Sequence, residues 1–162
     1  MERNELIAKV RSSLETLCAR GEYCSKDIFE KALRRLDGDE QGAREILSSL
    51  QGEGYQDDSR YAAAFAREKA AITGWGTIKI SAALRQKGIE PDIIKEALLE
   101  IDAPKAEDKL LHLLQTKAKS LRDDPQARLK LIRFALSRGY EYSGVKPLLD
   151  EAFEDLNQSS YK

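Results

Sequence analysis

The feature that most constrains the fold of this chain is a similarity between segments that lie 51 residues apart. At this distance Ala32-Leu33 recurs as Ala83-Leu84, Arg44-Glu45 as Lys95-Glu96, Lys87-Gly88 as Arg138-Gly139, and Leu98 as Leu149. A fixed period of this length is typical of repeat proteins, in which each repeat buries its open face against the next one.

We therefore predict three tandem repeats, residues 1–56, 57–102 and 103–157, followed by a polar tail at 158–162 that frays. Apolar residues at helical spacing, with no alternating pattern, predict three helices in each repeat and an all-α fold. The expected array is elongated and gently curved, with contacts only between neighbouring repeats.

The middle repeat has the clearest helical pattern. Asp57 or Asp58 is expected to cap its first helix, whose apolar face carries Tyr61, Phe65 and Ile72. A side-chain oxygen at this position accepts hydrogen bonds from backbone N–H groups that lack a partner within the helix.

Glycines mark the ends of the predicted helices. Gly74-Trp75-Gly76 breaks the first helix of the middle repeat, and Gly88 ends the second. Gly139 occupies the matching position in the third repeat. Because glycine lacks a Cβ atom, we expect Gly88 and Gly139 to adopt the left-handed conformation that often follows a helix.

The middle repeat also resembles a known family. Its matching residues are Asp58, Arg60, Tyr61, Ala62, Phe65, Trp75, Gly76, Ile80, Leu84, Lys87, Gly88 and Ile89. Together they closely resemble the RecX family, whose members regulate the RecA recombinase. The resemblance implies tandem three-helix repeats that bind RecA and its filament on DNA without catalysis or a cofactor. Seven of these residues are expected to be mainly structural: Asp58, Tyr61, Phe65, Trp75, Gly76, Leu84 and Gly88.

The composition limits where the protein can be located and which metal or catalytic sites it can form. No apolar run approaches the roughly 20 residues that span a bilayer, and residues 1–10 are too polar for a signal peptide, so we expect a cytoplasmic location without membrane contact. The chain has two cysteines, Cys18 and Cys24, and one histidine, His112. They are too few for a structural zinc site, which takes about four ligands, and they form no catalytic motif. We predict no enzyme activity, no metal and no cofactor.

The net charge of −1 hides a segregation of charge along the chain. Residues 59–87 hold six basic residues and one acid, and residues 105–138 hold nine basic residues and four acids, whereas residues 90–102 hold five acids and one lysine. Such basic segments suit a phosphate backbone or an acidic protein groove. The predicted contacts with RecA and DNA are Lys79, Lys87, Lys130, Arg133 and Arg138, with Arg60, Arg67 and Lys69 as outer members.

The second helix of the third repeat is expected to start at Pro125 and to separate charge from apolar residues. Lys130, Arg133 and Ser137 would form its polar stripe, opposite an apolar face of Leu129, Ile132, Ala135 and Leu136. The polar stripe is either a binding surface or an ordinary solvated face.

Two further residues also allow two interpretations. Trp75 either stacks on a base or anchors a partner, or it fills the junction between helices. Arg60 either contacts the partner or pairs with a nearby acid.

Three functions agree with these patterns. The resemblance implies a regulator, expected to be a monomer, that binds RecA and the RecA–DNA filament with non-specific contacts to the DNA backbone. The alternatives are an independent helix-turn-helix DNA-binding protein and a helical-repeat adaptor for another protein.

Overall fold

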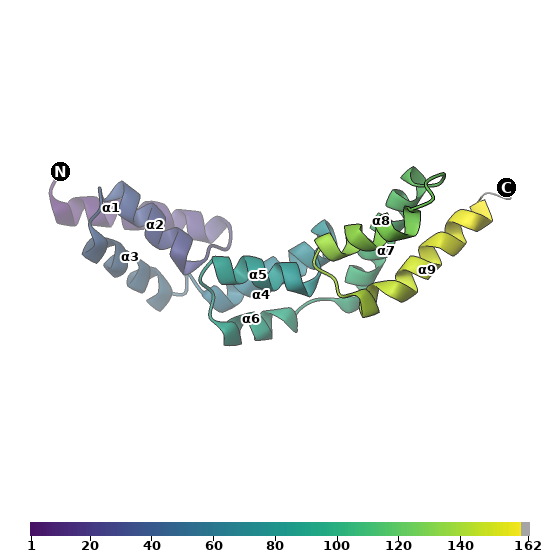
Figure 1. The fold of residues 1–162 in the computed structure, drawn as a ribbon. Coiled ribbons are helices and arrows are strands. Elements are labelled where there is room, and N and C mark those ends of the chain that lie inside the picture. The colour runs from purple at the N-terminus through teal and green to yellow at the C-terminus, as the bar shows by residue number, and fades with distance from the viewer. Residues whose placement is uncertain (160–162) are drawn as a thin grey trace. The chain divides into compact units, whose positions relative to one another are not determined.

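The computed structural model describes residues 1–159, with the side chains of residues 1–157. Within this range the chain forms nine α-helices and one π-helical turn and contains no strand, so the all-α prediction is confirmed (Figure 1). The helices are α1 (Arg3–Arg20), α2 (Ser25–Arg35), α3 (Glu40–Gly52), α4 (Asp58–Glu68), α5 (Thr77–Gln86), α6 (Pro91–Leu98), α7 (Ala103–Ser120), α8 (Ala127–Ser137) and α9 (Tyr142–Ser159). The π-helical turn, η1 (Lys69–Thr73), continues α4 directly. None of the described helices is both long enough and apolar enough to cross a bilayer.

The chain folds as two compact units. The first unit comprises Met1–Ala64 and Leu84–Ala97, and the second comprises Phe65–Ala83 and the chain from Leu98 onward. The borders of the units therefore fall inside α4, inside α5 and at the last residue of α6. The repeat boundaries that follow from the 51-residue period remain a prediction.

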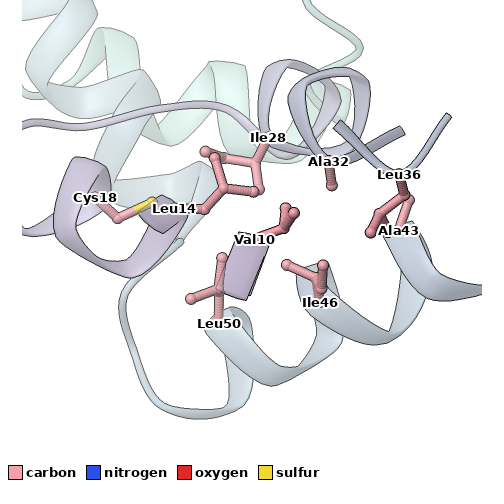
Figure 2. Packing of buried hydrophobic residues seen from close by; sticks show 9 residues of the cluster. All are labelled: Val10, Leu14, Cys18, Ile28, Ala32, Leu36, Ala43, Ile46 and Leu50. Carbon is pink, nitrogen blue, oxygen red and sulfur yellow. The ribbon is translucent and has the colours of Figure 1, made fainter. Parts of the chain in front are cut away.

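The core of the first unit lies among α1, α2 and α3 (Figure 2). Its buried residues are Val10, Leu14 and Cys18 of α1, Ile28 and Ala32 of α2 with Leu36 just after it, and Ala43, Ile46 and Leu50 of α3. Residues three or four positions apart share one face of a helix, so each helix presents one continuous apolar stripe to the other two. Cys18 and the nearby Cys24 are buried free thiols, and burial raises the pKa of both.

The core of the second unit lies among α7, α8 and α9. The buried residues are Leu110, Leu114 and Ala118 of α7, Leu131 and Ala135 of α8, and Val145, Leu149, Ala152 and Leu156 of α9. Asp102 begins α7 as its cap, since its carboxylate accepts from the backbone N–H of Lys105 at 3.1 Å.

Both predicted turn glycines have the expected backbone. Gly88 has a φ of 75° and Gly139 a φ of 95°. The left-handed conformation at both positions is thus confirmed. Their surroundings differ: a Cβ atom on Gly88 would have open space around it, whereas one on Gly139 would come within 2.6 Å of the backbone nitrogen of Lys79.

Three apolar residues were assigned to the wrong face. Ile72 is 68% exposed because it lies in η1, where the wider π-helical turn rotates the residues after α4 away from the expected face. Leu129 and Leu136 of α8 are 44% and 45% exposed. The buried face of α8 is formed by Leu131, which was not predicted, and by Ala135, which was, and the predicted Ile132 is partly buried against this core.

The limits of two helices also differ from the prediction. Pro125 lies in the turn before α8, which begins at Ala127. At the C-terminus α9 continues through Ser159, so the first two residues of the predicted polar tail are helical. The remaining tail residues, 160–162, lie outside the described residues.

Candidate functional site

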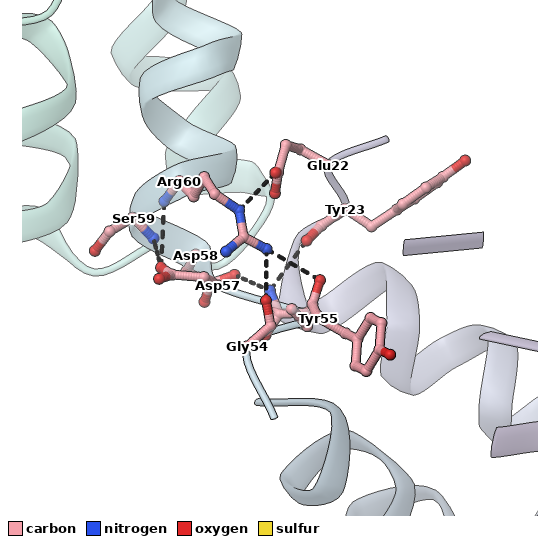
Figure 3. A network of polar contacts seen from close by, with 9 residues as sticks. Glu22, Tyr23, Gly54, Tyr55, Asp57, Asp58, Ser59 and Arg60 are labelled. Atoms are coloured by element: carbon pink, nitrogen blue, oxygen red, sulfur yellow. Dashed lines mark hydrogen bonds and ion pairs between the residues drawn. The ribbon is translucent and has the colours of Figure 1, made fainter. Parts of the chain in front are cut away.

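Two adjacent aspartates cap two different helices in the first unit, and Figure 3 shows both of them at the start of α4. Asp57 accepts from the backbone N–H of Ser59 at 2.8 Å and of Arg60 at 3.2 Å, so it is the cap of α4. Asp58 instead reaches α2, where it accepts from the backbone N–H of Ser25 at 2.8 Å and from the Ser25 hydroxyl at 2.8 Å. That backbone N–H belongs to the first residue of α2 and has no partner within the helix.

The buried Gln56 side chain completes this contact. Only 2% of Gln56 is exposed, and its Nε2 donates both to Asp58 Oδ1 and to the carbonyl of Tyr23, each at 3.0 Å. Its own oxygen accepts from Gln51 at 2.9 Å. Asp58 therefore joins the start of α4 to the start of α2, a structural role for this motif residue.

Arg60 also makes its contacts within the first unit (Figure 3). Its guanidinium donates from Nε to Glu22 at 2.5 Å and from Nη2 to the carbonyls of Gly54 at 3.0 Å and Tyr55 at 3.1 Å. Of the two interpretations of Arg60, pairing with a nearby acid is thus observed. A contact with RecA or DNA remains a prediction for this residue, whose side chain is 44% exposed.

Lys87 is paired in a similar way. Its ammonium group lies 3.1 and 3.2 Å from the two carboxylate oxygens of Asp27, and this hydrogen bonding raises the pKa of Lys87. The Lys87 side chain is 42% exposed.

In the second unit, Arg138 holds the end of η1. Its guanidinium donates to the carbonyl of Gly74 at 3.3 Å and also to the carbonyl of Thr73. Carbonyls at the end of a helix lack partners within it, and cations near them are favoured by the helix dipole. Arg138 is therefore placed to stabilise the fold, and its predicted contact with RecA and DNA remains a prediction.

The turn that contains Arg138 and Gly139 packs on the start of α5. The backbone N–H of Gly76 donates to the carbonyl of Arg138 at 2.7 Å, and that of Ile78 donates to the carbonyl of Gly139 at 3.1 Å. These bonds satisfy two donors at the start of α5 that have no partner within the helix. A Cβ atom on Gly76 would lie 2.7 Å from the backbone nitrogen of Tyr140, so the motif glycine permits this close approach.

Beside this turn, Trp75 lies between aromatic and cationic neighbours. The ammonium groups of Lys69 and Lys79 are 4.8 and 4.6 Å from the centre of its ring, and Phe65 meets it edge to face with ring centres 6.2 Å apart. Both lysines are only partly exposed, and neither has a carboxylate partner among the described side chains. Trp75 itself is half-buried, so it fills a junction and still presents part of its ring.

The remaining predicted contact residues differ in how far their charge is neutralised. Lys130 lies 2.5 Å from Asp124 and lowers the pKa of that carboxyl, and Arg67 lies 3.5 Å from Glu100. Arg133 is exposed on α8 and has no ion pair within residues 1–157. It stands between the exposed Leu129 and Leu136, at the spacing of one helical face.

The other motif residues are positioned as structural residues. Tyr61 is half-buried, and burial raises the pKa of its hydroxyl. Leu84 is fully buried in the first unit. Gly88 provides the left-handed turn after α5 described above.

Comparison with known proteins shows which family the chain belongs to. Residues 57–98 match the model of the second three-helix domain of RecX. A regulatory protein RecX of Clostridium botulinum is 31% identical over 94% of this chain and 72% of its own length. One of Chromohalobacter salexigens is 30% identical over 91% of this chain and 95% of its own length. The chain belongs to the RecX family.

Solved RecX structures agree with the helical architecture. A crystal structure of a regulatory protein RecX superimposes with a TM-score of 0.79 at 25% identity, covering 91% of this chain and 73% of the other. RecX from Lactobacillus salivarius has the same fold, with a TM-score of 0.75, covering 96% of this chain and 99% of the other. The chain is therefore an array of helical repeats, and its relatives are named regulatory proteins.

The Asp58 contact gives a testable prediction within this RecX motif. We expect Asp58→Ala to lower the free energy of unfolding by about 2 kcal/mol, because the Ser25 N–H loses its acceptor and the buried Gln56 amide loses one of its two acceptors. Asp58→Asn should lower the free energy of unfolding less, since the amide oxygen of asparagine can still accept from the Ser25 N–H and from the Gln56 amide. Urea unfolding followed by circular dichroism measures the difference, and Asp57→Ala is the control for loss of an ordinary cap, about 1 kcal/mol. If Asp58→Ala is as stable as the parent protein, Asp58 does not hold α2.

Proposed function

We propose that this chain is a non-enzymatic regulator that binds RecA and the RecA filament on DNA. In this role it limits the recombinase and co-protease activities of RecA during DNA repair and the SOS response. The observation that carries the proposal is membership of the RecX family over almost the whole chain, 94% of it in the alignment with the Clostridium botulinum relative. The proposal requires no cofactor, no metal and no second copy of the chain.

The surface of α8 supports a protein partner. Leu129, Arg133 and Leu136 lie on one exposed face of this helix, and Arg133 has no acid to neutralise it within the described part of the chain. Arginine is enriched at protein interfaces, and exposed leucines beside it offer apolar area to bury. The mixture of positive charge and apolar side chains suits an acidic protein groove better than DNA alone.

The predicted contact residues form two classes under this proposal. Five are already engaged by acids or carbonyls within the fold: Arg60, Arg67, Lys87, Lys130 and Arg138. Lys69, Lys79 and Arg133 lack a carboxylate partner among the described residues, and they are the side chains most able to move onto a partner. Such contacts bring non-specific attraction to DNA phosphates, which weakens as salt rises.

The proposal is tested by the activities of RecA. RecA is assembled on single-stranded DNA with ATP, and ATP hydrolysis and co-protease cleavage are followed as the chain is added. We expect both activities to fall in proportion to the amount of chain added. If both are unchanged at a molar excess of folded chain, the proposal is wrong. If the chain instead binds one duplex sequence tightly and leaves RecA unaffected, it is an independent DNA-binding protein.

A further inference from the structure

The contacts of Trp75 form a cluster that the family resemblance does not explain. Two ammonium groups, of Lys69 and Lys79, lie within 5 Å of the centre of one indole ring. A ring of this kind attracts cations only weakly at an exposed site, whereas a carboxylate or phosphate attracts them more strongly. The second unit offers neither lysine a carboxylate within its described residues, so both charges remain available to an anion.

The cluster is held on a rigid support. The backbone N–H of Trp75 donates to the carbonyl of Lys69 at 2.8 Å, across the π-helical turn. The neighbouring Gly76 is bonded to the carbonyl of Arg138 at 2.7 Å, and the preceding Gly74 has a left-handed φ of 78°. Single π-helical turns inside α-helices are frequent at functional sites. The indole thus has a fixed position, while the two lysine side chains can rotate.

A pocket opens beside the same ring. It has a volume of about 250 Å³ and is lined by Trp75 with apolar neighbours such as Ala70 and Ile101. Its wall also includes the hydroxyl-bearing residues Thr77 and Ser143 and one acidic residue, Glu141. Ligand sites are typically concave, mostly apolar and supplied with a few polar groups. This pocket is smaller than the usual drug-sized site of at least about 300 Å³, which favours a small planar group such as a single base.

We propose that Lys69, Trp75, Lys79 and this pocket form a subsite for one nucleotide of single-stranded nucleic acid. The phosphate is bound by the two ammonium groups, which leave the indole ring as they turn toward it. The exposed part of the ring then stacks on the base, as aromatic side chains do in proteins that bind single strands. This inference rests on the proposed function, in which the chain meets DNA inside the RecA filament.

The chemistry of the cluster favours a nucleotide over an acidic peptide. A carboxylate on a peptide would use the two lysines but would leave the indole and the pocket without a matching group. A nucleotide uses all three features, since it carries an anion next to a flat aromatic base. Every base has such a face, so we expect binding without sequence preference.

The test uses Trp75 itself, because it is the only tryptophan in the chain. The full chain, without RecA, is titrated at low salt with a short oligothymidylate, with an abasic phosphodiester of the same length, and with polyglutamate. We expect tryptophan fluorescence to fall with oligothymidylate, with the abasic strand binding about tenfold more weakly because it cannot stack. Polyglutamate should cause no comparable change. Equal binding of the abasic strand or of polyglutamate would overturn the proposal.

Variants distinguish this subsite from general charge attraction. Lys69→Ala/Lys79→Ala should weaken oligothymidylate binding about tenfold or more, whereas the control Lys9→Ala/Lys95→Ala removes two exposed lysines outside the basic segments and should bind like the parent. With a labelled oligonucleotide and anisotropy as the readout, Trp75→Phe should retain most of the affinity and Trp75→Leu should lose it. Circular dichroism checks the fold of each variant. If the lysine pair and its control bind equally well, there is no subsite at Trp75.

The same variants separate this proposal from the proposed function. If the chain does not bind oligothymidylate but still lowers RecA activity, the subsite is wrong and the regulator remains. If the oligonucleotide binds in the expected way while RecA is unaffected, the subsite stands and the regulatory function is wrong.

Discussion

The Gly139→Ala variant is expected to lose about 2–5 kcal/mol of unfolding free energy, the largest stability effect that this structure predicts. Two causes add at this position. A residue with a Cβ atom is strained at a φ of 95°, and that atom would press on the backbone of Lys79 at the start of α5. Because a backbone contact cannot be relieved by a side-chain rotation, the turn must move away from α5 and weaken the hydrogen bonds of Gly76 and Ile78.

Gly88 provides the matched control for this variant. It has nearly the same left-handed conformation, with a φ of 75°, but open space where a Cβ atom would lie. Gly88→Ala should therefore lower the free energy of unfolding only by the cost of a left-handed backbone for alanine, about 1–2 kcal/mol. Thermal unfolding measures the difference between the two variants, because each kcal/mol of unfolding free energy shifts the melting temperature of a chain of this size by about 2–4 °C. Equal melting temperatures for the two variants would contradict the role assigned to Gly139.

Charge reversal on α8 should have the largest effect on binding. We expect Lys130→Glu/Arg133→Glu to weaken binding to the RecA–DNA filament by tenfold or more at low salt, because two positive charges become negative beside an acidic, DNA-filled groove. Both residues are exposed, so the fold should be unchanged. Of the two single changes, Arg133→Glu should weaken filament binding more than Lys130→Glu, since Lys130 is already paired with Asp124 at 2.5 Å.

Two acidic residues serve as controls for this experiment. Glu45 of α3 and Glu96 of α6 are exposed and lie outside the predicted basic surface, so their replacement by lysine should change filament binding little. Surface plasmon resonance on immobilised filaments, repeated at several salt concentrations, gives the affinities and their salt slopes. If the folded double variant binds as tightly as the parent at low salt, the basic residues of α8 form an ordinary solvated face.

Local sequence patterns predicted much of this fold. The left-handed glycines 88 and 139 follow from the absence of a side chain at the end of a helix, and Asp57 follows from the chemistry of helix caps. The core of α1 to α3 follows from the spacing of its apolar residues. Each of these features depends on residues that are close together in the sequence.

Contacts between distant residues were not predictable in the same way. Asp58 caps α2 from 33 positions further along the chain, and Arg138 binds carbonyls 64 and 65 positions before it. Each residue type would suit a surface role equally well. Nothing in the spacing of Ser25 and Asp58 indicates that they meet, so their structural roles required the three-dimensional structure.

The errors in helix phase have a simpler origin. In α8, apolar residues occur on every side, because Leu129, Leu131, Ile132, Phe134, Ala135 and Leu136 follow within eight positions. Periodicity alone then fits more than one buried face. At Ile72 the phase was wrong because the π-helical turn holds an extra residue, which the sequence does not mark. The exposed Leu129 and Leu136 are now part of the surface proposed to meet RecA.

The most direct test of the central claim is a pull-down of RecA by the folded chain. RecA is offered alone, and after assembly on single-stranded DNA with a slowly hydrolysed ATP analogue, and single-stranded DNA is offered without RecA. The account predicts that the chain retains the assembled filament at least tenfold better than DNA alone, and that raising the salt releases it. Failure to retain RecA in either form, with a chain that circular dichroism shows to be folded and helical, would contradict the account.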